Sequence, residues 1–443
     1  MTNTTIAAVH GRRVWDSRGR PTVEVDVSLR GGATGRAIAP AGASMGSGEA
    51  VDLRDGGKKL GGFDVGRAVA SVNGEMEQAL IGQDAADQAA IDAIMIARDG
   101  TANKARLGGN AIVATSMAVL HAAAAAAKVP LWMHLAQGRK VRLPLPEIQI
   151  FGGGAHAARR VDVQDFMVMC PGAASFAQAI EWTAEVYLAA GSLMKQAGKL
   201  QGVADEGGYW PAFTSNEEAL DTLVRAIERA GLEPGPQVAI SLDVAASEFG
   251  KNGRYALALD DRALGTDEMI AMLGRWLDTY PIVSIEDPLA EDDAAGFRAF
   301  TAAYGDRCQV IGDDFLVTNA ARVAEAAASG AATAVLIKPN QAGTVTETRA
   351  ALDAGRQARF GTIVSARSGE TEDTTVVHLA VGWDAGQLKV GSFSRSERMA
   401  KWNECLRIEE AIGPDASFAG GAALGFRPVQ KKVTNDGLES TSV

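Results

Sequence analysis

The sequence has little cysteine, and the cysteines it has are dispersed. Only three, Cys170, Cys308 and Cys405, occur in 443 residues, and no two form a CxxC pair. A disulfide framework and a structural zinc site both need more cysteines at closer spacing, so the sequence argues against both. The pattern is typical of a reduced protein, and we expect it in the cytoplasm.

Long basic and long apolar segments are also missing. The chain has 43 Lys+Arg against 54 Asp+Glu, a formal net charge of −11, which argues against nucleic acid as a partner. The first residues lack the apolar stretch of a signal peptide, and the run of small apolar residues from His121 to Lys128 is too short to span a bilayer. We therefore expect no membrane partner, and an anionic ligand must be held by local cations or a metal ion.

The remaining composition, 47% hydrophobic and 22% charged, is that of a globular protein with a sizeable core. Alternation of apolar and polar residues from Val23 to Leu29 predicts a half-buried strand, and the RGGATG turn after it predicts a hairpin. The helix expected last in this region is rich in alanine and should pack closely against its neighbours. We expect an α+β domain over residues 1–135. Its predicted helices lie near 65–80, 86–98 and 109–128.

From about residue 143, short apolar runs alternate with longer amphipathic stretches, which indicates repeated strand–helix units and a parallel sheet. So many units in one segment favour a closed (β/α)8 barrel over residues 136–430, followed by a polar tail over 431–443. An open doubly wound sheet is the alternative. The predicted strands are QDFMVMC, VAISLDVA, IVSIED, QVIGDD, AVLIKPN, TIVSARS and LKVGS, and the predicted helices are 216–231, 267–279, 318–328 and 344–357.

Charged residues end five of these apolar runs: Asp243, Glu286, Asp313, Lys338 and Lys389. In a barrel, the ends of the strands converge on the face that carries the active site. Three carboxylates there would repel one another, and a hard divalent cation such as Mg²⁺ would relieve that repulsion. The alternative for each carboxylate is a helix cap or an ion pair.

The two lysines suggest a reaction class. Neighbouring positive charge lowers the pKa of a lysine, which makes Lys338 a candidate general base. Lys389 is a candidate anion holder, and the alternative for both is a structural ion pair. A neutral lysine, Mg²⁺ and a carboxylate substrate together indicate proton abstraction next to a carboxylate, with the metal stabilising the resulting enediolate.

Three loops add further candidates. Glu206 in GVADEGGYWP is a candidate general acid, although an acidic turn is the alternative. His156 lies in the glycine-rich FGGGAHAARR and is followed by two arginines, which suits an anionic substrate, although a lone histidine can be structural. Arg367 and Ser368 lie after a predicted strand and before a helix, a phosphate-binding geometry, with capping by Ser368 as the alternative.

Motifs along almost the whole chain, from about Val9 to Ile412, resemble the enolase family of phosphopyruvate hydratases. The resemblance implies an enolase-type (β/α)8 barrel that starts with two antiparallel strands, an α+β N-terminal domain, and a homodimer or higher homo-oligomer. The motifs are WDSRGRPTVEVDV, PAGASMGSGEAVDLRDGG, VADEGGYWP, SLDVAASEF, SIEDP, GDDFLVTN, LIKPNQAGTVTET, RSGETED and RSERMAKWNECLRIEE.

The resemblance also implies the chemistry. Members of the enolase superfamily are known to use a lysine base, with Mg²⁺ stabilising an enediolate. Lys338 would take the C2 proton of a 2-phosphoglycerate-like acid, and Glu206 would assist loss of the C3 hydroxide. Two Mg²⁺ ions are implied. Their implied ligands are Asp243, Glu286 and Asp313 for the first ion, and Ser44 with the substrate phosphate for the second.

The same resemblance implies the substrate contacts. Lys389 would hold the carboxylate of a small phosphorylated or phosphonylated acid. Arg367 and Ser368 would hold its phosphorus group, Gln164 would contact it, and His156 would close over it.

The departures from the family pattern lie on the side of the leaving group. The chain reads SARSGETED where enolases usually read SHRSGETED, so Ala366 replaces a histidine. It reads QDF where enolases usually read QEF, so Asp165 replaces a glutamate on the acid side of the active site. Ala366 offers room, while Arg159 and Arg160 offer positive charge for an additional carboxylate.

In these departures the chain is similar to the enolase-like carboxyphosphonoenolpyruvate synthases of phosphinothricin-type antibiotic pathways, whose product carries a carboxylated phosphorus in place of phosphate. We expect a specialised paralogue that keeps C2 deprotonation and acts on such an analogue. One alternative is an ordinary phosphopyruvate hydratase of glycolysis. Another is a non-catalytic enolase-like binding protein.

Overall fold

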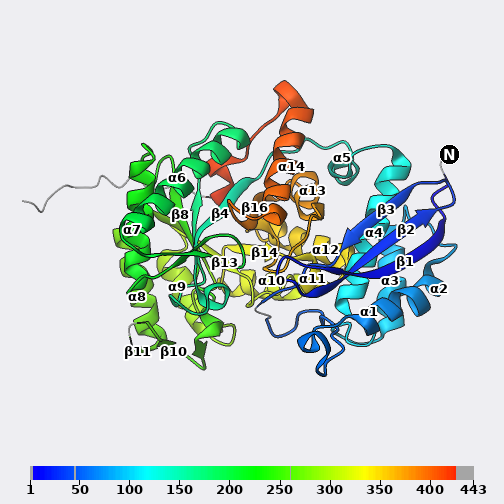
Figure 1. Cartoon of the computed structure of the whole chain (residues 1–443), viewed down its shortest axis with the longest axis horizontal. Coiled ribbons are helices and arrows are strands. Elements are labelled where there is room, and N and C mark those ends of the chain that lie inside the picture. The colour runs from blue at the N-terminus through cyan, green and yellow to red at the C-terminus, as the bar shows by residue number, and fades with distance from the viewer. Residues whose placement is uncertain (1–2, 44–45, 260, 426–443) are drawn as a thin grey trace, which may run out of the picture.

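The computed structural model describes residues 3–43, 46–259 and 261–425. An N-terminal part, blue to cyan in Figure 1, lies beside a larger barrel coloured green to orange. The N-terminal part begins with an antiparallel sheet of order β1-β2-β3. Val23, Val25 and Val27 of the second strand are fully buried, and the turn after it forms the predicted hairpin. The three strands are β1 (Ile6–Trp15), β2 (Pro21–Leu29) and β3 (Thr34–Ile38).

Helices cover this sheet, and α4 (Gly109–Ala127) lies directly against it. A Cβ added to Gly35 of β3 would lie 2.2 Å from the backbone of Ala118, so glycine and alanine together allow the close packing expected from the sequence. By length and composition α4 could cross a membrane, but 83% of its most apolar window is buried inside the protein, as in a core helix. The other helices are α1 (Gly66–Ser71), the π-helical η2 (Val72–Met76), α2 (Glu77–Leu80), α3 (Gln88–Asp99) and α5 (Leu131–Ala136).

The rest of the chain forms a closed eight-stranded barrel, which rules out the open sheet. The last strand pairs with the first, and β5 runs antiparallel to both of its neighbours while the other barrel pairs are parallel. The first two barrel strands are therefore antiparallel, as the resemblance to enolases implied. The barrel strands are β4 (Leu145–Gly152), β5 (Asp165–Met169), β8 (Ala239–Asp243), β12 (Ile282–Glu286), β13 (Gln309–Gly312), β14 (Ala334–Ile337), β15 (Gly361–Ser365) and β16 (Gly386–Ser392).

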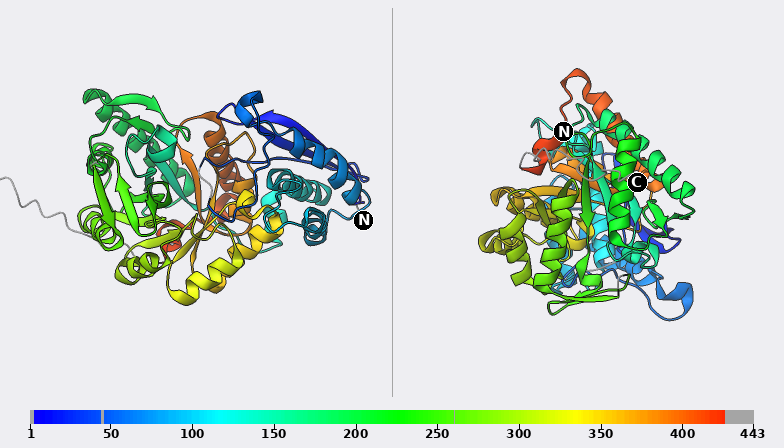
Figure 2. Two further views of the ribbon diagram at one scale, coloured as in Figure 1. Left: turned by 90° about the horizontal axis from the view of Figure 1, so that it is seen from below. Right: turned by 90° about the vertical axis from the view of Figure 1, so that its left-hand side faces the viewer.

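Helices surround the barrel, as the two views of Figure 2 show. They are α6 (Phe176–Gln196), α7 (Asn216–Arg229), α8 (Thr266–Thr279), α9 (Ala294–Tyr304), α10 (Ala320–Ser329), α11 (Pro339–Ala342), α12 (Val345–Gln357), α13 (Thr375–Gly382) and α14 (Ser396–Ile412). Short strands lie outside the barrel wall. These are β6 (Leu200–Val203), β7 (Tyr209–Pro211), β9 (Gly250–Lys251), β10 (Arg254–Leu257) and β11 (Arg262–Gly265).

Two details differ from the sequence prediction. Strand β4 was not among the predicted runs, because Pro146 and the polar Glu147 and Gln149 interrupt its apolar pattern, yet all eight of its residues are buried. Lys389 lies in the middle of β16 rather than at its end. Its side chain still reaches the end of the barrel that holds the carboxylates, because it contacts Asp243 there.

The N-terminal part contributes a segment that covers this end of the barrel. Ala41 and Gly369 exchange two backbone hydrogen bonds of 2.9 and 2.8 Å. Nearby, the amide of Ala50 donates to the carbonyl of Gln341 at 2.8 Å. Ala41 is thereby fixed to the loop that follows β15, and Ala50 to the short helix that follows β14, close to the residues of the candidate active site.

Candidate active site

A narrow cavity of about 20 Å³ lies where the barrel strands end. It brings together residues from strand ends and from loops that are far apart in the sequence. Most of the predicted catalytic and substrate-binding residues line it. They are His156, Gln164, Asp165, Glu206, Asp243, Lys338, Arg367, Ser368 and Lys389, together with Ala366.

The predicted metal carboxylates lie at one side of this cavity. Lys389 Nζ donates to Asp243 Oδ2 at 2.8 Å and to Glu286 Oε2 at 2.7 Å, so it bridges the ends of β8 and β12. Burial and the negative charge of Asp243 raise the pKa of Glu286 well above its usual range, and Asp313 adds to this. The carboxylates therefore repel one another as the sequence predicted, and the ion pair considered as the alternative for Lys389 is also present.

The donor atoms at this side fit Mg²⁺. Asp243 Oδ1 and Glu286 Oε1 are buried and accept no hydrogen bond from the described residues, and the same is true of Gln164 Oε1. Such oxygens are unstable without a partner, and an all-oxygen set is what Mg²⁺ prefers. Ser44, predicted to hold a second ion, lies outside the described residues.

The position of Asp313 depends on Asp287, the residue directly after β12. Asp287 accepts hydrogen bonds from the backbone amides of Asp313 and Asp314 at 2.9 and 2.8 Å. Oxygens of these three carboxylates lie within 4.8 Å of one another. Asp287 was not among the predicted residues, because the sequence offered no reason to separate it from Glu286 beside it.

Lys338 departs from the prediction about its proton. Its Nζ donates to Asp313 Oδ2. Burial is the largest influence and lowers the pKa of Lys338, but the charges of Asp313 and Glu286 together hold the pKa above its ordinary value, the opposite of the predicted direction. The prediction considered a metal ion and Lys389 as the neighbouring positive charges. Lys389 does lower this pKa, as does Arg367, but the prediction left out the closer carboxylate of Asp313.

At the other side of the cavity, His156 lies between two carboxylates. Its Nδ1 is 3.2 Å from Asp165 Oδ1 and its Nε2 is 3.8 Å from Glu206 Oε1. Burial disfavours the imidazolium, but Glu206 and Asp165 outweigh it and raise the pKa of His156 to about 9. Burial likewise opposes ionisation of Asp165, but the charge of His156 lowers the pKa of Asp165 to about 2. His156 is therefore a charged link between the two carboxylates.

A residue that the sequence analysis missed supports this group. Gln149 of β4 donates through Nε2 to Asp165 Oδ1 and accepts through Oε1 from the amide of Gly208 at 2.8 Å. It therefore connects Asp165 to the loop that carries Glu206. Gln149 lies in the strand that the apolar pattern did not reveal, so no spacing signal singled it out.

The predicted phosphate-binding residues are held by a second set of unpredicted partners. Arg367 is buried and pairs with Glu49 at 3.1 Å, and Gln341 donates to both Glu49 and Asp313 at 3.2 and 2.9 Å. Behind them, the fully buried Arg398 donates to the carbonyls of Arg367 and Ser368. Glu49, Gln341 and Arg398 all lie within the motifs that resembled enolases, which was the one available signal.

Two predicted residues lie away from the cavity. Arg159 has a side chain that is 66% exposed and pairs with Glu248 at 3.3 Å, and Arg160 is exposed. A role for them in substrate binding stays a prediction. Ala366, in contrast, lines the cavity directly, together with Lys389 and Arg367.

Comparisons with known proteins agree with this geometry. A family model described as the enolase N-terminal domain matches residues 6–135, and one described as the enolase C-terminal TIM barrel domain matches residues 140–425. The chain is also similar to a protein named Enolase 1 from Desulfitobacterium hafniense (strain Y51). The two are 48% identical over 428 residues, which are 96% of this chain and 98% of the relative. The chain therefore belongs to the enolase family and is an enolase-type hydro-lyase.

Proposed function

We propose that the protein converts 2-phosphoglycerate to phosphoenolpyruvate, the reaction of an ordinary phosphopyruvate hydratase. The observation that carries this proposal is that a lysine and a carboxylic acid, Lys338 and Glu206, line one small cavity together with cationic groups for a carboxylate and a phosphate. The similarity to the relative named Enolase 1 supports the same reaction over that of a phosphonate-specific paralogue.

The side chains divide the work in a simple way. Lys389 and the carboxylates around it orient the substrate carboxylate, while Arg367 and Ser368 hold the phosphate. Asp243, Glu286 and Asp313, with further help expected from Ser44, would hold Mg²⁺, which would supply positive charge to stabilise the negative charge that develops on the substrate carboxylate. A cation bound to Asp313 would draw on the negative charge that raises the pKa of Lys338. Binding of the cation would therefore lower the pKa of Lys338.

Lys338 then takes the proton from C2, and the C3 hydroxyl leaves as water after it receives a proton from the other side of the cavity. His156 holds a proton up to a pH of about 9 and lies 3.8 Å from Glu206. We assign storage of that proton to His156 and its delivery to Glu206. Asp165 positions the imidazole through Nδ1.

The test is formation of phosphoenolpyruvate, followed by absorbance, from 2-phosphoglycerate with Mg²⁺ present. The proposal expects turnover that is lost with EDTA and in Lys338→Ala. Lys251→Ala is a matched control, because Lys251 is exposed and lies outside the cavity. No turnover by the parent protein at saturating substrate would overturn the proposal.

A second candidate rests on Ala366, which lines the cavity with a methyl group where enolases usually carry a larger histidine. The smaller side chain suits a substrate in which a carboxylated phosphorus replaces the phosphate. Comparison of kcat/KM for the two substrates separates the candidates. A preference for the phosphorus-modified analogue, reversed by Ala366→His, would favour the specialised paralogue.

We further propose a homodimer in the cytoplasm, without a nucleic-acid or membrane partner. The three cysteines are buried free thiols, which suits a reducing compartment. Light scattering after size exclusion measures the oligomeric state, and a monomer at micromolar concentration would contradict the dimer.

A further inference from the structure

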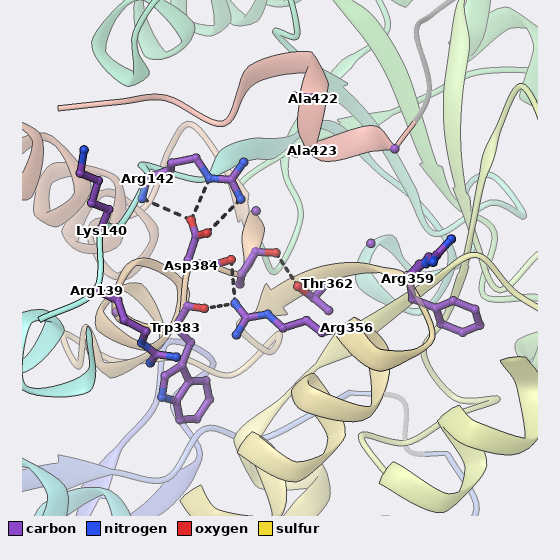
Figure 3. A pocket seen from close by; sticks show the side chains of 16 residues that line it. Arg139, Lys140, Arg142, Arg356, Arg359, Thr362, Trp383, Asp384, Ala422 and Ala423 are labelled. Atoms are coloured by element: carbon purple, nitrogen blue, oxygen red, sulfur yellow. Dashed lines mark hydrogen bonds and ion pairs between the residues drawn. The ribbon is translucent and has the colours of Figure 1, made fainter. Parts of the chain in front are cut away.

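A second cavity lies at the opposite end of the barrel from the catalytic residues. Its volume is about 380 Å³, and it is lined by Gly361 and Thr362 at the start of β15 and by Gly386 at the start of β16 (Figure 3). The catalytic cavity lies where these same strands end, beginning with Ser365. The two cavities therefore share strands but no lining residue.

We call this second site the basic cavity because of its charge. Five cationic side chains line it, and Asp384 is the one carboxylate among its lining residues. Asp384 is already occupied, since it accepts two hydrogen bonds from Arg142 at 2.9 and 3.0 Å. Such a concentration of positive charge contrasts with the net charge of −11 of the whole chain. The cations are Arg139, Lys140, Arg142, Arg356 and Arg359.

Two of the cations are held in place by backbone carbonyls, and Arg356 also forms a long ion pair of 3.8 Å with Asp353. Arg139 donates to the carbonyl of Ala136 at 2.9 Å, and Arg356 donates to the carbonyl of Asp384 at 2.9 Å. Burial lowers the pKa of Arg356, and the positive charge of Arg349 lowers it further, so the nearby carboxylates do not compensate. The guanidinium groups are thus ordered before any ligand arrives, which reduces the entropy lost on binding.

A purely structural role explains only part of this charge. Helices α5, α12 and α13 end near the cavity, and each C-terminus carries about half a negative charge that cations stabilise. That role suits Arg139 and Arg356. It does not account for Lys140 and Arg359, which are exposed and pair with no carboxylate in the part of the chain that the structure describes.

We propose that the basic cavity binds a small anion that carries two or more phosphate groups. A guanidinium group can donate two parallel hydrogen bonds to two oxygens of a phosphate group. The volume of the cavity lies in the usual range for small-molecule sites. In Figure 3, Lys140, Arg139 and Arg142 lie toward one side and Arg359 toward the other, with Arg356 between them. A single phosphate reaches one group of cations, whereas a chain of phosphates contacts both.

The test is calorimetric titration of metal-free protein with orthophosphate, pyrophosphate and tripolyphosphate at low salt, where charge interactions are least screened. We expect tripolyphosphate to bind the parent most tightly. The double variant Lys140→Glu with Arg359→Glu should weaken this binding roughly tenfold or more, because two charge-assisted contacts are lost. The double variant Lys251→Glu with Arg262→Glu is the matched control, since it makes the same charge change at exposed positions outside the cavity.

The control should change affinity by less than about threefold, because distant surface charges are largely screened. Equal weakening by the two double variants, absence of tripolyphosphate binding to the parent, or equal affinity for orthophosphate and tripolyphosphate would each overturn the proposal. Circular dichroism checks that the variants fold. If the Lys140→Glu, Arg359→Glu protein does not fold, the pair Lys140→Gln with Arg359→Gln makes the same comparison. The result does not depend on the proposed catalytic function.

Discussion

The two sides of the catalytic cavity are built in different ways. The base side consists of Asp243, Glu286, Asp313, Lys338 and Lys389, each on a barrel strand or directly after one. The acid side consists of Gln149, His156, Asp165 and Glu206. Its central members come from loops, since His156 lies in a short 3-10 turn and Glu206 lies between β6 and β7. All of the base side lies on barrel strands or directly after them, whereas the acid side combines two strand residues, Gln149 and Asp165, with loop residues joined to them by hydrogen bonds.

Variants that disable the base or the acid separately should have the largest effects on the reaction and should show whether the two sides act independently. Lys338→Ala should lower both dehydration and the exchange of the C2 hydrogen with solvent deuterium by about 10⁴-fold. Glu206→Gln should lower dehydration by roughly 10²–10⁴-fold but leave exchange measurable, because exchange needs only the base. Mass spectrometry of recovered 2-phosphoglycerate measures exchange. Undiminished exchange in Lys338→Ala would remove Lys338 from the mechanism.

The same division explains what the sequence could predict. Parallel strands of a barrel end on one face, so residues such as Asp243 and Glu286 could be grouped from their position after apolar runs. Loop residues have no such rule. His156 and Glu206 were candidates from the composition of their loops, with a structural role as the alternative, and the resemblance to enolases then implied their specific roles. Gln149 could not be found, because a polar residue inside a buried strand breaks the pattern that reveals the strand.

The proton on Lys338 shows a further limit. A strand-end position predicts which residues meet, but it does not predict which of several charges lies nearest. Asp313 and Arg367 act on the pKa of Lys338 in opposite directions, and the contact with Asp313 decides the outcome. Such contacts depend on side-chain conformation and on the backbone hydrogen bonds to Asp287, neither of which the sequence displays.

Glu147 offers a way to test how strained the base side is. It is fully buried in β4, next to Lys389 in register, and neither of its carboxylate oxygens forms a hydrogen bond of ordinary geometry with a described residue, although Ser241 lies close enough to favour the ionised form slightly. Burial raises the pKa of Glu147 to about 7. The unfolded chain ionises at a lower pH, near 4.3, so the free energy of unfolding should fall as the pH rises from there to about 7.

We therefore expect Glu147→Met to stabilise the protein at pH 8 by about 3 kcal/mol, since the apolar side chain needs no proton and no partner. The gain should shrink toward pH 4.5, where Glu147 is largely protonated in both states. Urea unfolding at the two pH values measures it. A gain independent of pH would mean that packing, and not ionisation, is responsible.

Mg²⁺ should act on the base side alone. Binding to the folded state adds about 2.7 kcal/mol at a concentration 100 times the dissociation constant. Melting temperatures with Mg²⁺ and with EDTA measure the gain, which Asp243→Asn should reduce and His156→Gln should leave. Equal melting temperatures in the parent protein at saturating Mg²⁺ would count against the metal site.

The smallest expected effect concerns how the acid side is held. Asp165→Glu lengthens a side chain that already contacts Gln149, so the two groups should compete for the same space. Gln149→Asn alone withdraws the amide from Asp165. The double variant restores the combined length, so the two changes should couple favourably by about 1 kcal/mol in unfolding free energy, as expected for residues in direct contact. Dehydration rates should recover in the same double variant, because Asp165 orients His156. Additive effects in both measurements would show that Gln149 does not position this side of the cavity.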